Sequence, residues 1–457
     1  MAHLATIDES SLEALATTFS GELLRPGDDG YEEARRVHNG LIDKRPALIA
    51  RCRDAADVAA GVGFGRDAGL EISVRGSGHN VSGRAVTDGG LMVDLSLMKK
   101  VTVDPGARTV RAEAGVTWGE LNDATAVHGL VTPGGVVSTT GIAGLTLGGG
   151  LGWLMGKYGL AVDNLLSVEL VTAAGEVLTV TGESDPDVFW ALRGGGGNFG
   201  VATWFDYRLH PLREVVGGVV MHAFEAAGEV LRFFRDFTQE LPDELVVVGA
   251  LTHAPDGSGT PVTGFGVCHC GSAEQAEADL RPALEFGSPI VAEVGPMPYP
   301  VVNTMFDEAY PRGALNYWKS SFLQELSDDA IDVLVEQFAA TPSPMTLIGI
   351  EHFHGAVSRV GVSDTAVPHR EPGYNLIITS VWTDPGATDE NVAWTREAYG
   401  ALEPHFSSLR YVNYFDADDV GDAVRAAYGP NYERLRKIKR RYDPDNLFRL
   451  NTNIEPA

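Results

Sequence analysis

Apolar and polar positions in the first quarter of the chain predict a β-α-β unit. Residues 48–52 form a short apolar run that is typical of a buried strand. Asp54 follows as a helix N-cap, and the helix that it opens is expected to end near Gly69. The next strand, residues 71–74, leads directly into Gly76. The usual dinucleotide fingerprint places its glycine loop after the first strand, so a typical Rossmann site is not expected.

The rest of the chain divides into two parts that differ in their predicted secondary structure. Residues 91–95 read as a further strand, and two hairpins are expected, one at residues 101–112 and one at 167–180. From about residue 208, strand-like runs alternate with longer helical stretches. The expected strands are 246–251, 262–268, 346–350 and 376–381, and the expected helices are 273–286, 328–340 and 390–402. This pattern predicts an α+β protein whose second domain is a sheet covered by helices. A basic helix, residues 429–441, follows near the end of the chain.

Glycine is concentrated in three loops. Residues 134–152 contain eight glycines, residues 194–200 contain five, and residues 75–79 form a smaller cluster. Apolar residues such as Ile142 and Trp153 interrupt these loops, which argues against a flexible linker. Backbone N–H groups in glycine-rich turns form nests that bind phosphate without side-chain charge. Several separated nests indicate an extended ligand, and the apolar residues between them suit a flat ring system, so FAD fits better than a mononucleotide.

The overall composition excludes several functions. The 457 residues include 62 acidic and 35 basic side chains, for a net charge of -27. This negative field repels nucleic acid and anionic lipid, so neither is an expected partner. Three cysteines cannot form a disulfide framework, and no signal peptide or membrane-spanning run is recognisable. We therefore expect a soluble, cytoplasmic protein. The sequence leaves the oligomeric state open.

Several ordered segments resemble the berberine-bridge-enzyme-like flavoproteins, which belong to the vanillyl-alcohol-oxidase superfamily with a PCMH-type FAD-binding domain. The matching segments are residues 75–83, 141–152, 157–164, 190–200, 368–370, 411–414 and 442–453. The resemblance implies a two-part FAD-binding domain, residues 1–207 with a C-terminal segment, 411–457, that returns to it. Residues 208–410 would then form a substrate-binding domain with an antiparallel sheet covered by helices.

The resemblance also implies how FAD is held. A neutral imidazole nitrogen is a nucleophile, and His79 matches the family histidine that carries FAD through its 8α-methyl group. Many members add a cysteine link in the second loop, but Val137 stands there, so we predict a single bond through His79. We also predict that the protein binds no metal. The other expected cofactor contacts are Arg75, Gly76, Ser77, Gly78, Asn80, Gly83, Val137, Ser138, Thr139, Gly141, Gly144, Gly149, Gly150, Gly152, Tyr158, Gly159, Asp163, Asn164, Gly200, Val201, Asn413, Asn451 and Asn453.

Four residues are catalytic candidates. Thr140 occupies the family position beside the reactive face of the flavin, where it either controls oxygen access or is only packed in the loop. Tyr411 and Tyr414 are expected on a strand, where alternation would send them to opposite faces unless a bulge or twist intervenes. Each is a candidate base or a packed aromatic residue. Glu351 shares a strand face with Phe353 and either positions substrate, activates a tyrosine or is a solvated edge residue.

These features lead to three functional hypotheses. The resemblance implies an FAD-dependent oxidase or oxygenase that oxidises a small organic molecule, such as an alcohol, sugar, alkaloid or polyketide, with hydride transfer to flavin N5 and O2 as acceptor. The alternatives are a dehydrogenase with another acceptor and a non-catalytic flavoprotein that sequesters a small molecule. Some plant relatives carry a catalytic acid near Thr379, and a threonine cannot replace it. Five aromatic residues of the second domain either line an apolar cleft or form core: Phe306, Tyr310, Tyr317, Trp318 and Phe322.

Overall fold

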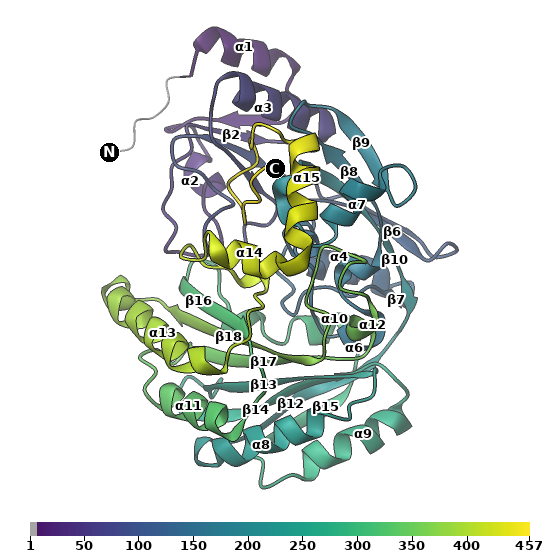
Figure 1. The fold of residues 1–457 in the computed structure, drawn as a ribbon, viewed down its shortest axis with the longest axis vertical. Helices are drawn as coiled ribbons and strands as arrows, with labels where there is room; N and C mark the ends of the chain where they lie inside the picture. Colours follow the sequence, from purple (N-terminus) through teal and green to yellow (C-terminus); the bar gives the residue numbers. More distant parts are fainter. Residues whose placement is uncertain (1–6) are drawn as a thin grey trace.

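The computed structural model describes residues 7–457, which fold around two main hydrophobic cores, one in the N-terminal half and one beneath a large sheet (Figure 1). A four-stranded sheet opens the first half, with the order β1-β2-β4-β3. Its strands are β1 (Glu22–Leu24), β2 (Leu48–Arg51), β4 (Leu91–Asp94) and β3 (Ile72–Arg75). The strand β4 pairs in parallel with β2 and β3, and α3 (Ala55–Asp67) makes the crossover. The predicted β-α-β unit is therefore confirmed, with Asp54 capping α3 by accepting the Asp57 N–H at 2.9 Å.

A second, antiparallel sheet completes the first core. Its order is β5-β6-β10-β8-β9, and its edge pairs are the two predicted hairpins. The strands are β5 (Val101–Asp104), β6 (Thr109–Glu113), β10 (Val201–Arg208), β8 (Leu165–Val171) and β9 (Val177–Thr181). A short pair, β7 (Leu130–Val131) with β11 (His210–Pro211), lies beside it. Helices and turns around these sheets are α1 (Glu9–Thr18), α2 (Tyr31–Ala34), α4 (Trp118–Ala126), α5 (Ile142–Leu147), α6 (Met155–Tyr158), η1 (Ala161–Asn164), α7 (Pro186–Leu192) and η2 (Gly196–Asn198).

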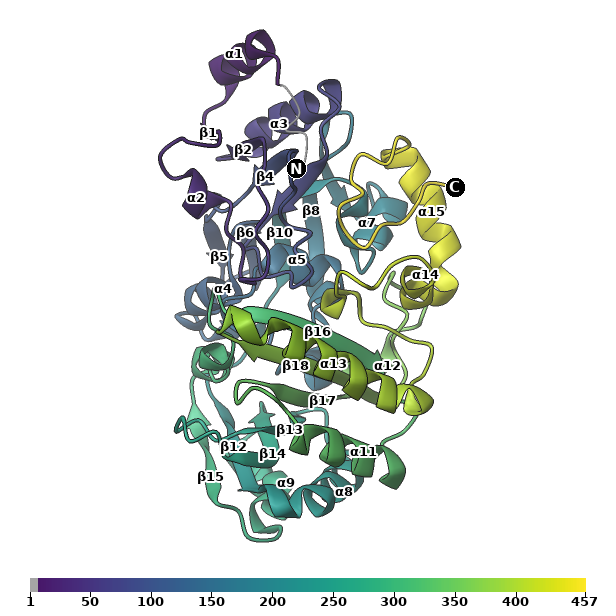
Figure 2. The same cartoon turned by 90° about the vertical axis from the view of Figure 1, so that its left-hand side faces the viewer.

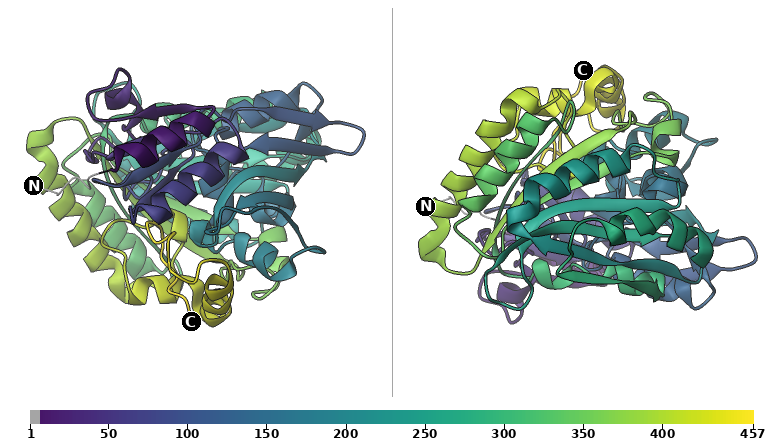
Figure 3. Two further views of the ribbon diagram at one scale, coloured as in Figure 1. Left: turned by 90° about the horizontal axis from the view of Figure 1, so that it is seen from above. Right: turned by 90° about the horizontal axis from the view of Figure 1, so that it is seen from below.

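The second half is built on a seven-stranded antiparallel sheet with the order β15-β12-β14-β13-β17-β18-β16. The strands are β12 (Val215–Ala223), β13 (Leu245–His253), β14 (Pro261–His269), β15 (Val291–Met297), β16 (Leu315–Phe322), β17 (Leu347–Phe353) and β18 (Gly373–Trp382). Helices that cover one face are α8 (Ala227–Thr238), α9 (Ala273–Glu285), α11 (Asp328–Ala339) and α13 (Thr388–Leu402), as Figures 2 and 3 show. The opposite face is free to meet the glycine loops of the first half.

Because the strands are pleated, alternate residues of this sheet point to opposite faces. On β17, Ile348 and Ile350 are fully buried in the core beneath the helices, whereas Glu351 points to the other face. The predicted strands 246–251, 262–268, 346–350 and 376–381 are confirmed, and the predicted helices agree with α9, α11 and α13 within two residues. Strands β12, β15 and β16 were not predicted. The reason is clearest for β16, whose eight residues are all buried although half of them are polar, so no alternation marks the strand.

The C-terminal segment returns to the first half. Leu435 and Ile438 of α15 (Tyr432–Tyr442) pack in the N-terminal core, and Figure 1 draws α15 beside α7. The Lys439 ammonium reaches back to the Asn198 carbonyl at 2.8 Å. The domain boundaries at 207 and 410 stay predictions, although this packing supports a returning segment. The remaining elements are α10 (Tyr299–Asn303), α12 (Ala356–Arg359), α14 (Asp422–Tyr428), η3 (Phe224–Ala226), η4 (Asp307–Ala309), η5 (Pro385–Ala387), η6 (Glu403–His405), η7 (Val412–Tyr414) and η8 (Gly429–Asn431).

One local prediction is wrong. Residues 411–414 were expected on a strand, but Val412–Tyr414 forms a single 3-10 turn. Strand alternation therefore does not decide where the two tyrosines point. Within residues 7–457, none of the helices combines the length and the apolar character that a bilayer crossing demands.

Candidate active site

Two neighbouring cavities meet where the glycine loops face the large sheet. Each has a volume of about 190 Å³. Asn80, Gly144 and Asn413 line both cavities, so the two spaces share a wall. The pair therefore forms an elongated site that extends from the large sheet to the C-terminal segment, which suits a ligand with two separate parts.

Many of the predicted site residues line these cavities. Those at the first cavity are His79, Asn80, Val137, Thr140, Gly144, Glu351, Asn413 and Tyr414. Those at the second cavity are Gly76, Asn80, Gly144, Gly200, Val201, Asn413 and Asn451. The fold thus brings together side chains from the first loop, the second loop, the large sheet and the C-terminal segment.

The wall of this site fits a dinucleotide. A side chain at Gly144 or Gly197 would meet no protein atom within 4 Å, so glycine there leaves open space that a ligand can occupy. The Asn451 Oδ1 atom is buried without a hydrogen-bond partner at the second cavity. Arg84, which was not predicted from the sequence, is the one guanidinium among the described residues that line this cavity. Open glycine backbone, an unpaired amide oxygen and a single cation match the needs of a pyrophosphate and its sugars.

His79 is only partly exposed and faces the first cavity. Its ring stacks on His38 with centroids 4.1 Å apart and an angle of 24°. Burial, and to a smaller extent the nearby His38, lowers the pKa of His79 to about 3. The imidazole is therefore neutral at physiological pH, the state in which its nitrogen lone pair is available for bonding.

The two tyrosines occupy different environments. Tyr411 is 1% exposed, and its hydroxyl oxygen accepts hydrogen bonds from the Gly150 and Leu151 N–H groups at 2.9 and 3.2 Å. It does not line either cavity. Tyr414 lines the first cavity and donates to Glu351 Oε1 at 2.7 Å. Burial raises the pKa of Tyr411 to about 12 and that of Tyr414 well above 10. Only Tyr414 combines access to the cavity with a carboxylate partner.

Glu351 is 4% exposed and lines the first cavity from strand β17. Asn375 stands opposite it in the β17–β18 register, and the Asn375 amide donates to Glu351 Oε2 at 2.7 Å. Burial raises the pKa of Glu351 to about 7, against the opposing effect of the Asn375 and Tyr414 hydrogen bonds. The neighbours His352 and His354 line a different surface hollow, as strand alternation predicts. A carboxylate that titrates near neutral pH beside a tyrosine can take up and release protons.

Two family models match the chain, an FAD binding domain over residues 46–181 and a berberine and berberine-like model over residues 410–455. The chain is 32% identical over 464 residues to (R)-6-hydroxynicotine oxidase of Paenarthrobacter nicotinovorans, covering 98% of this chain and 99% of that protein. It is 30% identical over 444 residues to an FAD-linked oxidoreductase of Dictyostelium discoideum, covering 96% and 95%. The chain belongs to the berberine-like FAD-linked oxidoreductases.

Solved structures agree with this family. The crystal structure of 6-hydroxy-D-nicotine oxidase from Arthrobacter nicotinovorans superposes with a TM-score of 0.89 at 31% identity, covering 96% of this chain and 98% of that one. A berberine-like protein of Physcomitrella patens gives 0.88 at 23% identity, covering 98% and 99%, which shows the shared fold. The family resemblance, the PCMH-type α+β fold and FAD as cofactor are therefore confirmed for this berberine-like oxidoreductase.

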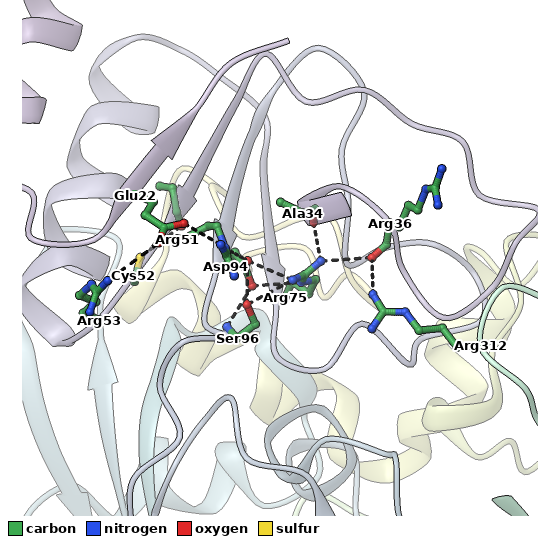
Figure 4. A network of polar contacts seen from close by, with 11 residues as sticks. Glu22, Ala34, Arg36, Arg51, Cys52, Arg53, Arg75, Asp94, Ser96 and Arg312 are labelled. Atoms are coloured by element: carbon green, nitrogen blue, oxygen red, sulfur yellow. Dashed lines mark hydrogen bonds and ion pairs between the residues drawn. The ribbon is translucent and has the colours of Figure 1, made fainter. Parts of the chain in front are cut away.

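Arg75 does not line either cavity of this oxidoreductase, although it was predicted to contact the cofactor. Its guanidinium forms a bidentate ion pair with Asp94, with both contacts at 3.0 Å (Figure 4). It also donates to the carbonyl oxygens of Ala34 and Arg36. Arg75 ends strand β3, so these bonds anchor the start of the loop that carries His79. The charge of Arg75 is paired with Asp94, and its contact with the cofactor stays a prediction.

Several other predicted residues also lie outside the two cavity walls: Ser77, Gly78, Gly83, Ser138, Thr139, Gly141, Gly149, Gly150, Gly152, Tyr158, Gly159, Asp163, Asn164 and Asn453. Some of them support the site from behind. Asp163 forms a bidentate ion pair with Arg370 at 2.8 and 2.9 Å, and Tyr158 stacks on His210 at 4.1 Å. Ser138 donates its N–H to Asp307 across the two halves at 2.9 Å.

Most of the sheet residues that close the first cavity were not predicted from the sequence. The missed lining residues there are Val248, Ala250, Leu347, Gly349 and Ile377. Of the five aromatic residues singled out, Phe306, Tyr310 and Trp318 line the cavity, whereas Tyr317 and Phe322 pack elsewhere. The alternation of small and apolar residues along β13 and β17 was a usable signal. It could not say which face of the sheet meets the flavin loops.

Proposed function

We propose that this berberine-like protein is an oxidase that holds FAD through a single bond to His79, oxidises a small organic molecule and uses O2 as electron acceptor. One observation carries the proposal: His79 and the Tyr414–Glu351 pair line the same cavity. When bound, FAD supplies the redox chemistry, because it accepts a hydride from the substrate carbon at N5 and passes two electrons to O2.

The protein's own part is to move a proton. A substrate hydroxyl or amine must lose its proton as the carbon is oxidised. Tyr414 does not ionise by itself near neutral pH, since burial raises its pKa. It can instead accept the substrate proton while its own proton moves to Glu351 Oε1, to which it already donates. In this proposal Tyr414 is the contact with substrate and Glu351 is the group on which the proton rests.

The remaining site residues hold the cofactor. Val137 lines the first cavity and cannot form a thioether, which supports attachment through His79 alone. In the second cavity, the backbone at Gly76 and Gly200, with Asn451 and Arg84, would hold the pyrophosphate end. We also propose that residues 1–207 and 411–457 form the FAD-binding unit and 208–410 the substrate-binding domain.

The colour of the purified protein tests the redox role. We expect yellow protein that bleaches with substrate under anaerobic conditions, recovers its colour in air and then produces hydrogen peroxide. Colour recovery only with an artificial acceptor would instead identify a dehydrogenase. Ligand binding without any bleaching would identify a sequestering protein, and a colourless protein that takes up no added FAD would refute the whole proposal.

The acidity of Glu351 predicts a pH profile. Because the carboxylate must be deprotonated to receive a proton, and its pKa is raised to about 7, kcat/KM should rise with pH through about 7. Glu351→Gln should abolish this rise and lower kcat by about 10²–10⁴-fold. The control is His352→Gln on the opposite strand face. An unchanged profile in Glu351→Gln would remove Glu351 from the proton path.

Thr140 is expected to influence reoxidation. Its side chain lines the first cavity, and the Thr140→Val variant keeps the shape but removes the hydroxyl. Loss of one hydrogen bond from the Thr140 hydroxyl to the bound flavin, of about 1 kcal/mol, should lower the rate constant for reoxidation by O2 about fivefold. Stopped-flow absorbance measures this rate. Thr140→Ser, which keeps the hydroxyl, is the matched control. Equal rates in Thr140→Val and the wild type would reduce Thr140 to a packing role.

A further inference from the structure

The substrate-facing wall of the first cavity is apolar. It is built mainly by the inner face of the large sheet and the segment before β16: Val248, Phe306, Trp318, Leu347 and Ile377. Trp318 and Phe306 add aromatic surface, on which a flat ring can pack face to edge or offset. Water bound against such a wall is readily displaced by an apolar molecule.

Several polar groups at or behind this wall already have protein partners. Tyr310 and Thr379 hydroxyls lie 3.3 Å apart, and Asn375 and Tyr414 both donate to Glu351. A polyol would exchange its hydrogen bonds to water for few bonds to protein, and an unpaired buried hydroxyl is unfavourable.

The charged residues that line the first cavity also disfavour an anionic substrate. Glu351 is the one carboxylate among the described lining residues, and no lysine or arginine lines the first cavity. An anionic substrate would be buried without a counter-ion and beside a carboxylate that is ionised above pH 7. A neutral molecule or a monocation meets no such penalty.

We propose that the substrate is a compact, flat, mostly apolar ring compound, neutral or singly cationic, with one hydroxyl or amine that reaches Tyr414. Sugars and compounds with a carboxylate or phosphate are excluded. The proposal rests on the proposed oxidase function only in placing the reacting group at the Tyr414–Glu351 pair. The choice of ring and charge follows from the wall itself.

Three probes test this class: 2-naphthalenemethanol, its carboxylate analogue 6-(hydroxymethyl)-2-naphthoate, and D-glucose. Binding is measured anaerobically from the shift of the flavin absorbance band, which needs no turnover. We expect the neutral alcohol to bind at least about tenfold more tightly than either other probe, the effect of roughly one unpaired buried group. Equal or tighter binding of the carboxylate or of glucose overturns the inference, as does no binding of the alcohol.

A designed cation sharpens the same test. Leu347→Arg places a guanidinium in the apolar wall and should raise the affinity for the naphthoate at least about tenfold relative to the neutral alcohol. Leu347→Met keeps an apolar wall and should keep the wild-type preference. The wild-type comparison decides the matter if the arginine variant does not fold. If the holoprotein binds the probes but its flavin is never reduced, the oxidase proposal is refuted and the proposed substrate class still holds.

A second inference concerns His38, which stacks on His79. His38 is 7% exposed, and its backbone N–H donates to the Gly78 carbonyl at 2.9 Å. Burial, followed by the nearby Arg312, lowers the pKa of His38 to about 4, so its ring is neutral. Two neutral rings can remain stacked, whereas two imidazolium rings would repel each other.

The segment that carries His38 is held from both halves of the molecule. Arg75 and Arg312 both donate to the Arg36 carbonyl, where Figure 4 draws them converging. The Gly313 N–H donates to the His38 carbonyl at 2.9 Å. These bonds fix the backbone that carries His38, and the buried His38 ring stacks on His79, where it restricts the rotation of the His79 ring.

We infer that His38 is a positioning residue for covalent attachment of FAD, because it fixes the plane of the His79 ring. This inference rests on the proposed His79 linkage. Attachment replaces the imidazole N–H and one C–H of the flavin 8α-methyl group by an N–C bond. The two protons and two electrons released reduce one O2 to hydrogen peroxide, so the step is balanced.

The test measures covalent incorporation of FAD into apoprotein, followed by flavin fluorescence of the denatured protein band. His38→Ala removes the stacked ring and should slow incorporation at least about tenfold, whereas His38→Phe keeps an aromatic ring and should stay within about threefold of wild type. Wild-type rates in His38→Ala, or an equally slow His38→Phe, overturn the role. If the wild type itself holds no covalent flavin, the linkage proposal fails instead.

Discussion

Tyr414→Phe is expected to lower kcat by about 10²–10⁴-fold, the usual contribution of a positioned acid–base group. The variant removes the hydroxyl that faces the first cavity and donates to Glu351, and it keeps the aromatic ring that packs against Trp318. FAD should stay bound. Anaerobic stopped-flow measurement of flavin reduction isolates the chemical step from reoxidation.

Tyr411→Phe is the matched control for this experiment. Tyr411 lines neither cavity, and its hydroxyl accepts hydrogen bonds from the Gly150 and Leu151 N–H groups and from the Asn413 amide. Losing it should decrease the free energy of unfolding by about 1–3 kcal/mol, since buried donors lose their acceptor, while most of the reduction rate is retained. If Tyr411→Phe were the slower variant and Tyr414→Phe reacted normally, the proton path would have to run through Tyr411.

In the His79→Ala variant, the flavin should no longer be covalently bound, so acid should release all of it. In the wild type we expect acid precipitation to leave the flavin in the pellet and the intact mass to include FAD. In His79→Ala all flavin should appear in the supernatant, because no cysteine and no second histidine is among the described residues that line the first cavity, and Val137 stands where many relatives form their second link. The digested peptide that contains residue 79 should carry the added mass in the wild type.

Val137→Ala provides the control for the attachment site. It alters the second loop at the position where many relatives carry a cysteine, and it should leave the covalent yield unchanged. Flavin that stays with the His79→Ala protein, or flavin that the wild type releases quantitatively, would contradict attachment through His79. Either result would leave the family assignment intact, because that rests on the matches along the whole chain.

Local signals in the sequence were sufficient for much of this protein. Asp54 caps its helix because a short carboxylate side chain can accept a backbone N–H one turn ahead, which depends on neighbouring residues alone. The hairpins at β5–β6 and β8–β9 follow from turn residues between apolar runs. Densely placed glycines and a histidine in one loop, together with ordered family segments, were enough to identify an FAD-linked oxidoreductase and its fold.

Only the tertiary structure decided which tyrosine meets the cavity, because a 3-10 turn replaced the expected strand at Val412–Tyr414. The raised pKa of Glu351 also has no local origin, since it depends on burial among strands distant in sequence and on Asn375 across the β17–β18 pair. The ion pair of Arg75 with Asp94 likewise depends on the adjacent parallel strand β4, which local sequence does not specify. The sequence by itself determined the cofactor loops and the family. Long-range packing decided proton chemistry and the apolar wall, because burial and charge pairing depend on residues that only folding brings together.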